Sequence, residues 1–189
     1  MDREAELRLV EGLRRGEESA FDAVYEEYRP RLYSFVLRMV GRREAAEELA
    51  QEAWMRLAAK AGSLRADTRL GPWLFAVARN LCLSYWRTRG IEGFADTAPR
   101  ALERVTVDAP SPERSAESGE GVARLEAALA GLPPRYREAL LLVGVEGMAP
   151  GEAAGVCGLT PEAMRKRLER ARDLLAARLE LVRSRAAKD

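Results

Sequence analysis

The sequence predicts an all-α protein of two small helical domains joined by a flexible linker. Apolar residues recur at steps of three and four along most of the chain, a spacing that gives each helix one buried side. Alternating runs of β-branched residues, which would indicate strands, are nearly absent. A hydrophobic content of 47% allows real cores, and a charged content of 32% indicates helix faces in water.

The first predicted domain, residues 1–90, contains a series of amphipathic segments. Its helices are expected over residues 3–15, 17–28, 31–40, 43–62 and 72–89. Gly16 separates the first two helices, and Pro30 and Pro72 are expected to open two others, because proline fits the first turn of a helix better than its interior. The polar stretch 63–71 is expected to form a loop.

Helical periodicity disappears over residues 91–121. This stretch is rich in Pro, Ser and Ala, and it holds seven acidic side chains against three basic ones. Such a composition cannot bury much apolar surface, so we expect an acidic, flexible linker. The second predicted domain covers residues 122–189.

Residues 150–172 have the pattern of a helix-turn-helix. A short helix beginning at Pro150 should end at Gly158, and Thr160 can cap a second helix that has Pro161 in its first turn. Two helices joined by a short glycine-containing turn are typical of DNA-binding motifs whose second helix enters the major groove. An ordinary helical hairpin with a basic exposed face is the alternative at this point.

The second helix of this pair combines a buried stripe with a cationic outer side. The stripe is formed by Met164, Leu168, Ala171, Leu175, Leu179 and Val182. Five of the eight residues 165–172 are cationic, although the net charge of the whole chain is only +1. Such a local concentration of positive charge favours nucleic-acid binding over a merely solvated face.

Two helices of the first domain also carry polar faces that could be functional. The helix over 43–62 has a glutamate-rich side, which is either solvated or a partner surface. The helix over 72–89 interleaves aromatic residues with arginine and asparagine, which can stack on and hydrogen-bond unpaired bases. A core helix with a basic end explains the second pattern equally well.

Several classes of site and location are disfavoured by composition. The chain has no histidine, which removes histidine-ligated zinc sites and Ser-His catalytic pairs. Cys82 and Cys157 lie in different segments and are expected to be free thiols. The longest apolar run, 139–145, is too short to span a bilayer, and no signal peptide is apparent. We therefore expect no metal, no cofactor, no membrane insertion and a cytoplasmic location.

Four segments of the chain form a recognisable series: FDAVYEEYRPRLY from Phe21, AEELAQEAW from Ala46, WLFAVARNL from Trp73, and LPPRYREALLL from Leu132 followed by the helix-turn-helix. In content and order they resemble the extracytoplasmic-function (group IV) sigma factors of bacterial RNA polymerase. The resemblance implies an alternative sigma factor without catalysis of its own. It further implies binding to core RNA polymerase and recognition of the minus-35 and minus-10 promoter elements.

The resemblance also implies roles for matched positions. Docking on the clamp of the polymerase's largest subunit is assigned to Glu47, Glu48, Leu49, Gln51, Glu52 and Trp54. Melting and reading of the minus-10 element is assigned to Arg65, Arg69, Trp73, Asn80, Ser84 and Arg87. Contact with the minus-35 duplex is assigned to Thr160, Glu162, Arg165, Lys166, Arg167, Glu169 and Arg170. An anti-sigma factor is the expected inhibitory partner.

This chain departs from the family pattern at three positions. Ser84 stands where aspartate is usual, and Ala149 and Ala153 replace a serine cap and a large apolar residue. Gly151 and Gly155 each cost the short helix about 1 kcal/mol relative to alanine, so this helix should depend on packing.

Two other functions remain possible on the residues alone. A stand-alone helix-turn-helix regulator would need a dimerisation element, and no heptad seam is present. A helical hydrolase or nuclease would need carboxylates that converge on a metal, whereas these lie on exposed faces beside lysine and arginine. The open linker also allows an autoinhibited state in which the two domains pack together.

Overall fold

The computed structural model describes residues 2–90 and 119–186, with the backbone alone for residues 120 and 182–186. Within these ranges the regular structure is entirely helical, which confirms the predicted all-α class. The N-terminal unit contains α1 (Arg3–Arg14), α2 (Glu18–Val40), α3 (Arg43–Lys60), the 3₁₀ turn η1 (Ala61–Ser63) and α4 (Leu70–Thr88). The C-terminal unit contains α6 (Glu120–Ala130), α7 (Pro134–Leu140), the π-helical turn η3 (Leu141–Val145), α8 (Pro150–Cys157) and α9 (Pro161–Ala186).

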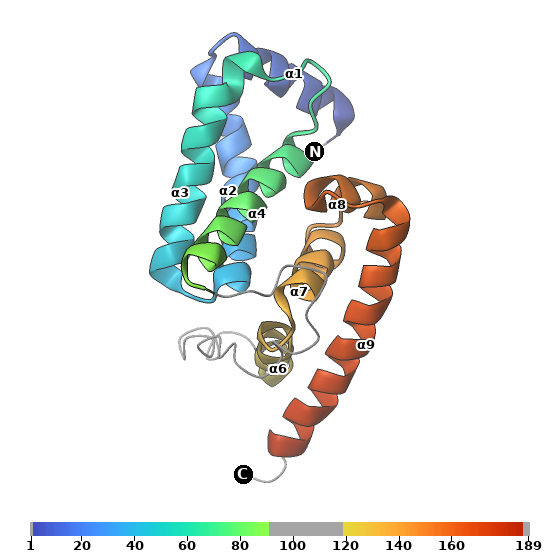
Figure 1. Cartoon of the computed structure of the whole chain (residues 1–189). Helices are drawn as coiled ribbons and strands as arrows, with labels where there is room; N and C mark the ends of the chain where they lie inside the picture. The colour runs from blue at the N-terminus through green and yellow to red at the C-terminus, as the bar shows by residue number, and fades with distance from the viewer. Residues whose placement is uncertain (1, 91–118, 187–189) are drawn as a thin grey trace.

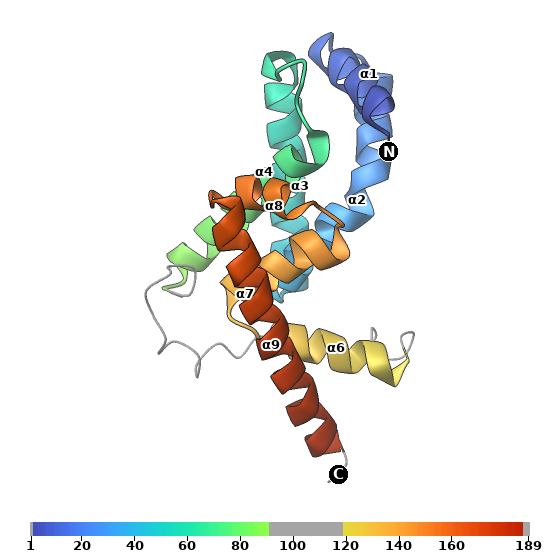
Figure 2. The same cartoon turned by 90° about the vertical axis from the view of Figure 1, so that its right-hand side faces the viewer.

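The two units pack against each other. Helices α2, α3 and α4 form a bundle, and α8 lies between α4 and the long helix α9 (Figures 1 and 2). One contiguous apolar cluster contains side chains of both units, from Phe35 and Phe75 to Met164. Most of the predicted linker, residues 91–118, lies outside the described residues.

The prediction that Pro30 opens a new helix is wrong, because α2 runs through it without a break. Proline removes one helical hydrogen bond and costs about 3 kcal/mol in a helix interior. Here Pro30 and Glu26, whose carbonyl loses its donor, are both exposed, so water can satisfy that carbonyl. Tyr28 and Leu32, on either side, are buried in the same core, and a continuous helix keeps both of them there.

The first turn of α4 receives its cap from α1. Glu6 is 6% exposed, and its carboxylate accepts a hydrogen bond from the backbone N–H of Leu70 at 2.8 Å. The same carboxylate forms ion pairs with Arg3 and Arg69. Arg69, the residue before α4, makes no side-chain cap of its own. A residue more than sixty positions away therefore satisfies a buried donor that the local sequence leaves open.

Substituting Glu6 should destabilise the N-terminal unit. Glu6→Ala leaves the Leu70 N–H without its acceptor and removes the counter-charge of two arginines, so we expect a loss of about 2 kcal/mol in urea unfolding. Glu6→Gln keeps an oxygen that can accept from the Leu70 N–H, so this variant should lose less stability. The control is Glu4→Ala, because Glu4 is exposed on the same helix and, among the described residues, forms an ion pair with Arg8. An equal loss for Glu4→Ala and Glu6→Ala would contradict the capping role.

The helix-turn-helix forms as predicted. Gly158 adopts a left-handed φ of 67° at the end of α8, and the Thr160 hydroxyl accepts from the backbone N–H of Ala163 at 3.2 Å. Ala149 cannot cap α8 with its side chain. Instead, the Glu152 carboxylate accepts from the backbone N–H of Ala149 at 3.1 Å. Burial of Ala153 and Ala154 supplies the packing that this glycine-containing helix needs.

Candidate nucleic-acid interface

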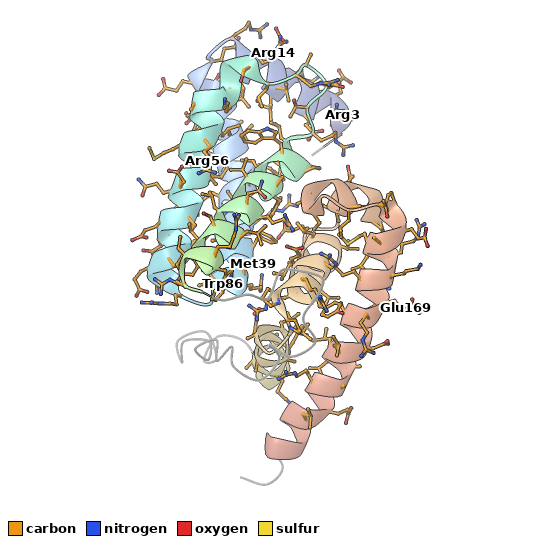
Figure 3. All side chains as sticks on the ribbon, in the orientation of Figure 1. Arg3, Arg14, Met39, Arg56, Trp86 and Glu169 are labelled. Carbon is orange, nitrogen blue, oxygen red and sulfur yellow. The ribbon has the colours of Figure 1, made fainter. Side chains whose placement is uncertain are left out.

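The outer side of α9 presents the predicted duplex-contacting residues to solvent. Met164, Leu168 and Ala171 are buried on the inner side of the helix, as predicted, whereas Leu175 and Leu179 of the same stripe are only half-buried and the side chain of Val182 lies outside the described residues. The exposed members of the predicted set are Thr160, Glu162, Arg165, Lys166, Glu169 and Arg170. Glu169 lies on the side of α9 that faces away from the N-terminal helices (Figure 3). This surface is open to a DNA groove even though the two units are packed together.

Arg167 is placed differently from the rest of this set. Its side chain is only 9% exposed, and it donates to the carboxylate of Glu138 on α7 at 3.0 Å. Glu138 is itself fully buried. In this conformation Arg167 therefore holds α9 to α7 and does not stand on the outer face of the helix.

A second candidate surface is a stripe along α4. Asn80, Ser84 and Arg87 are exposed and share one side of the helix, because their spacing of four and then three residues returns to the same face. Trp73 lies seven residues before Asn80 on the same side and is half-buried. An aromatic ring in line with polar tips can stack a base and hydrogen-bond its edge.

The two loop arginines before α4 are in different environments. Arg65 is 84% exposed and donates to Asp67, and this contact raises the pKa of Arg65 and lowers the pKa of Asp67. Arg69 lies between two carboxylates, 3.1 Å from Glu6 and 3.0 Å from Glu152 of α8. Arg65 is therefore available to a ligand, whereas Arg69 is engaged by the C-terminal unit.

Helix α3 lies on the part of the bundle away from α9 (Figure 1), and its glutamate-rich side is exposed. Glu47, Glu48 and Gln51 are exposed, and Glu52 and Leu49 are half-buried. Trp54 lies beneath this surface, because it is 8% exposed and its ring packs against Tyr25 with the centroids 4.9 Å apart. Trp54 supports α3 from the core and cannot itself touch a partner in this conformation.

Met55 is a candidate that the sequence reasoning missed. Its side chain is 60% exposed, although methionine is usually buried. It lies three residues after Glu52 and four after Gln51, on the same face of α3 as the glutamates. The signal was present in the sequence, since an apolar residue outside the buried stripe of an amphipathic helix has no core to enter.

Two buried charges on α7 were also missed. Arg137 is 1% exposed and Glu138 is fully buried, although charged side chains are seldom fully buried. Glu138 pairs with Arg79 of α4 at 2.9 Å as well as with Arg167. Charged residues on the apolar side of a helix indicate a buried polar network, and here the network joins α4, α7 and α9.

Neither a metal-binding cluster nor a membrane-spanning helix is found in the described residues. No group of three His, Cys, Asp or Glu side chains in residues 2–90 and 119–186 is arranged to hold a metal ion. In the same part of the chain, every helix is too short or too polar to cross a membrane.

Comparison with protein families identifies both units. Residues 24–91 match the family model of Sigma-70 region 2, and residues 123–175 match that of Sigma-70 region 4. The solved structure of CnrH in complex with the cytosolic domain of CnrY is similar in fold. Its TM-score is 0.72 at 21% identity, with 94% of this chain and 98% of CnrH covered. The sigma factor RpoE of Bartonella quintana, solved with the anti-sigma factor NepR, has a TM-score of 0.66 at 28% identity over 85% of this chain and 96% of RpoE.

Two sigma factors are similar to this chain over most of their length. The chain is 33% identical to the ECF RNA polymerase sigma factor EcfG of Rhodopseudomonas palustris, over 79% of this chain and 80% of EcfG. It is 32% identical to the RNA polymerase sigma factor CarQ of Myxococcus xanthus, over 85% of this chain and 90% of CarQ. Matches to both sigma regions along one chain favour a sigma factor over a stand-alone regulator. The chain belongs to the extracytoplasmic-function sigma factors, the alternative sigma subunits that direct promoter-specific initiation of transcription.

Proposed function

We propose that the two units of this sigma factor read different promoter elements. Residues 1–90 dock on core RNA polymerase and handle the minus-10 element, residues 122–189 read the minus-35 element, and residues 91–121 connect them. The observation that carries this assignment is the exposed cationic side of α9, opposite its buried stripe. The protein acts in the cytoplasm, where its polymerase and promoter are, and it contributes recognition and no catalysis of its own.

Arg165, Lys166 and Arg170 are the main minus-35 contacts in this proposal. Guanidinium and ammonium groups on the first turns of a recognition helix can pair with guanine or neutralise phosphates. The exposed pair of Glu162 and Lys166, 2.8 Å apart, stabilises little and can exchange for DNA contacts. Arg167 contributes by fixing α9 on α7, and a direct DNA contact would require it to leave Glu138.

The minus-10 element is read by the stripe of Trp73, Asn80, Ser84 and Arg87, with Arg65 nearby. An unpaired strand presents base faces for stacking and base edges for hydrogen bonds, which the mixed aromatic and polar stripe can match. Arg69 becomes available to the strand only when Glu152 releases it. The sequence-specific part of recognition is therefore assigned to the exposed stripe.

Polymerase docking is assigned to the outer side of α3. Glu47, Glu48 and Glu52 supply negative charge for a basic partner surface, Gln51 supplies a hydrogen-bonding amide, and Met55 supplies an exposed apolar contact on the same face. Protein interfaces usually have few charged residues at their core and a polar rim around it. By analogy with the relative solved with NepR, an anti-sigma factor is the proposed inhibitor.

Reading two promoter elements at once requires the units to separate. The positions minus-35 and minus-10 are about 85 Å apart along B-form DNA, at 3.4 Å per base pair. A compact chain of 189 residues has a radius of gyration of about 16 Å, so the packed arrangement cannot reach both. Residues 91–118, about 28 residues, can span about 95 Å when fully extended.

The test is in-vitro transcription with core polymerase and a pool of promoter fragments, with and without the protein. We expect promoter-specific transcripts only when the protein is present. The docking variant Glu48→Lys/Glu52→Lys should bind core polymerase at least about 10-fold more weakly, because reversed charges repel a basic surface. The matched control, Glu18→Lys/Glu26→Lys, reverses two exposed charges on α2. Equal weakening by both pairs would remove α3 from the docking assignment.

A further inference from the structure

Four ion pairs between described residues join the two units, and these four have the same polarity. Among the described residues they connect Arg31 with Glu146 at 3.0 Å, Arg38 with Glu126 at 2.7 Å, Arg69 with Glu152 at 3.0 Å, and Arg79 with Glu138 at 2.9 Å. In each pair the arginine belongs to the N-terminal unit and the glutamate to the C-terminal unit. We call these four arginines the arginine face.

The geometry of these contacts is the one that arginine uses for phosphate. Arg38 donates through Nε and Nη2 to the carboxylate of Glu126, and Arg79 donates through the same two nitrogens to the two oxygens of Glu138. Arg31 donates to both the carboxylate and the backbone carbonyl of Glu146. A planar guanidinium fork accepts a carboxylate or a phosphate in the same bidentate manner.

Two members of the arginine face lie on or next to α4, the helix that carries the candidate strand-reading stripe. Arg69 immediately precedes α4, and Arg79 is the neighbour of Asn80. Arg31 and Arg38 are two helical turns apart on one side of α2, which packs against α4. Residues 64–90 contain five arginines and a single acidic residue, Asp67. The surroundings of the stripe are therefore suited to a polyanion.

We propose that the arginine face binds the backbone phosphates of single-stranded DNA, and that four C-terminal glutamates occupy it in the free chain as substitutes for those phosphates. This extends the proposed function from base reading by α4 to sequence-independent contacts by α2 and the start of α4. Closure of the two units and binding of a strand are then mutually exclusive, because both need the same guanidinium groups.

Separation of the units leaves the most buried of these glutamates with a partner. Glu138 loses Arg79 but keeps Arg167, which belongs to its own unit and lies 3.0 Å away. The side chains of Glu126 and Glu152 are already 19% and 30% exposed, and that of Glu146, which is 3% exposed, becomes hydrated when the units separate. A strand that supplies phosphates to the arginines can therefore replace the glutamates without stranding a buried charge.

A native thiol reports whether the units have separated. Cys157 of α8 is 7% exposed and lies beside the Arg79–Glu138 pair. Burial raises the pKa of the Cys157 thiol to about 12, which keeps it protonated and slow to react with disulfide reagents. In a Cys82→Ala background, the rate of reaction with Ellman's reagent measures loss of the α4 contact.

The first experiment adds a twenty-nucleotide poly(dT) strand to the Cys82→Ala chain. We expect the Cys157 reaction to accelerate about 10-fold as the strand saturates, because phosphates displace the glutamates and expose the thiol. An unchanged rate at saturating oligonucleotide overturns the proposal, whether or not promoter-directed transcription is observed.

The second experiment measures affinity for fluorescein-labelled poly(dT) by anisotropy. Glu126→Gln/Glu146→Gln/Glu152→Gln should bind about 10-fold more tightly than the original chain, since three arginines are released. The control Asp22→Asn/Glu26→Gln/Glu44→Gln removes the same charge from exposed N-terminal positions and should change affinity less than about 2-fold. Adding Arg31→Gln/Arg38→Gln to the triple glutamine variant should cancel its gain. A gain that survives these two arginine substitutions overturns the arginine face as the binding surface.

Discussion

Arg137→Met should be the most destabilising single substitution at the contact between the two units, with an expected loss of about 3–5 kcal/mol. The buried guanidinium donates to five backbone carbonyls and has no acidic partner among them. Two of these carbonyls belong to Arg38 and Met39 at the end of α2. The other three belong to Leu129, Ala130 and Leu132, at and after the end of α6. Methionine fills a similar volume but removes all five donations, and of these carbonyls that of Leu129 still accepts from the backbone N–H of Leu132 at 3.0 Å.

Urea unfolding followed by circular dichroism gives the measurement. Burial lowers the pKa of Arg137 to about 10, so the side chain remains charged at pH 7 and the loss should be constant from pH 6 to pH 8. Arg137→Lys should recover only part of the stability, because an ammonium group cannot reach acceptors in two helices at once. Arg172→Met, on the exposed side of α9, is the matched control and should change stability by less than about 0.5 kcal/mol. A loss no larger than this control would show that water replaces the guanidinium.

Arg165→Ala/Lys166→Ala should reduce promoter-specific transcription about 100-fold while leaving the fold intact. Both side chains are exposed on α9, so their removal costs little packing. Each contact of this kind with a base or phosphate is worth about 1–3 kcal/mol, and two of them account for the expected loss. The readout is the yield of specific transcripts with core polymerase at fixed salt concentration.

The matched control for this variant is Arg14→Ala/Arg15→Ala, which removes the same charge from the end of α1. It should transcribe normally. Both variants should bind core polymerase with the original affinity, because neither of them changes a residue of α3. Full activity of the α9 variant would mean that another surface reads the minus-35 element.

The helix-turn-helix was predictable because its signals are local. Thr160, Pro161 and Gly158 each act within one turn of their own position, through a cap, a fixed φ and a left-handed conformation. The buried stripe of α9 follows from helical periodicity alone. The structure therefore confirms this element at its predicted position.

The remaining features depend on partners that are distant in sequence. Pro30 predicts a helix start by local rules, but burial of Tyr28 and Leu32 in one core keeps α2 continuous. Only the family resemblance assigned Trp54 to the docking surface, whereas helical periodicity places it on the buried side, and its neighbours in space are aromatic residues of α2. Periodicity identifies a helix face as apolar or polar, but it does not say which other helix covers it.

Charged residues were the hardest to place from sequence. Arg79 and Arg167 look like other exposed arginines of their helices, and only Glu138, on the buried side of α7, brings them together. The pairing of Arg69 with Glu6 and Glu152 likewise joins three separate segments. Interactions of this kind depend on tertiary geometry, which no short sequence window contains.

The exposed side of α3 has a thermodynamic consequence for how the two units separate. Helix α3 packs on α2 and α4, and its glutamate-rich face remains open when the units are closed. A ligand that binds two conformations with equal affinity cannot shift the equilibrium between them, however tightly it binds. Docking through α3 alone therefore recruits closed and open chains alike. The free energy that separates the units has to come from contacts that only the open chain can make, such as those with promoter DNA.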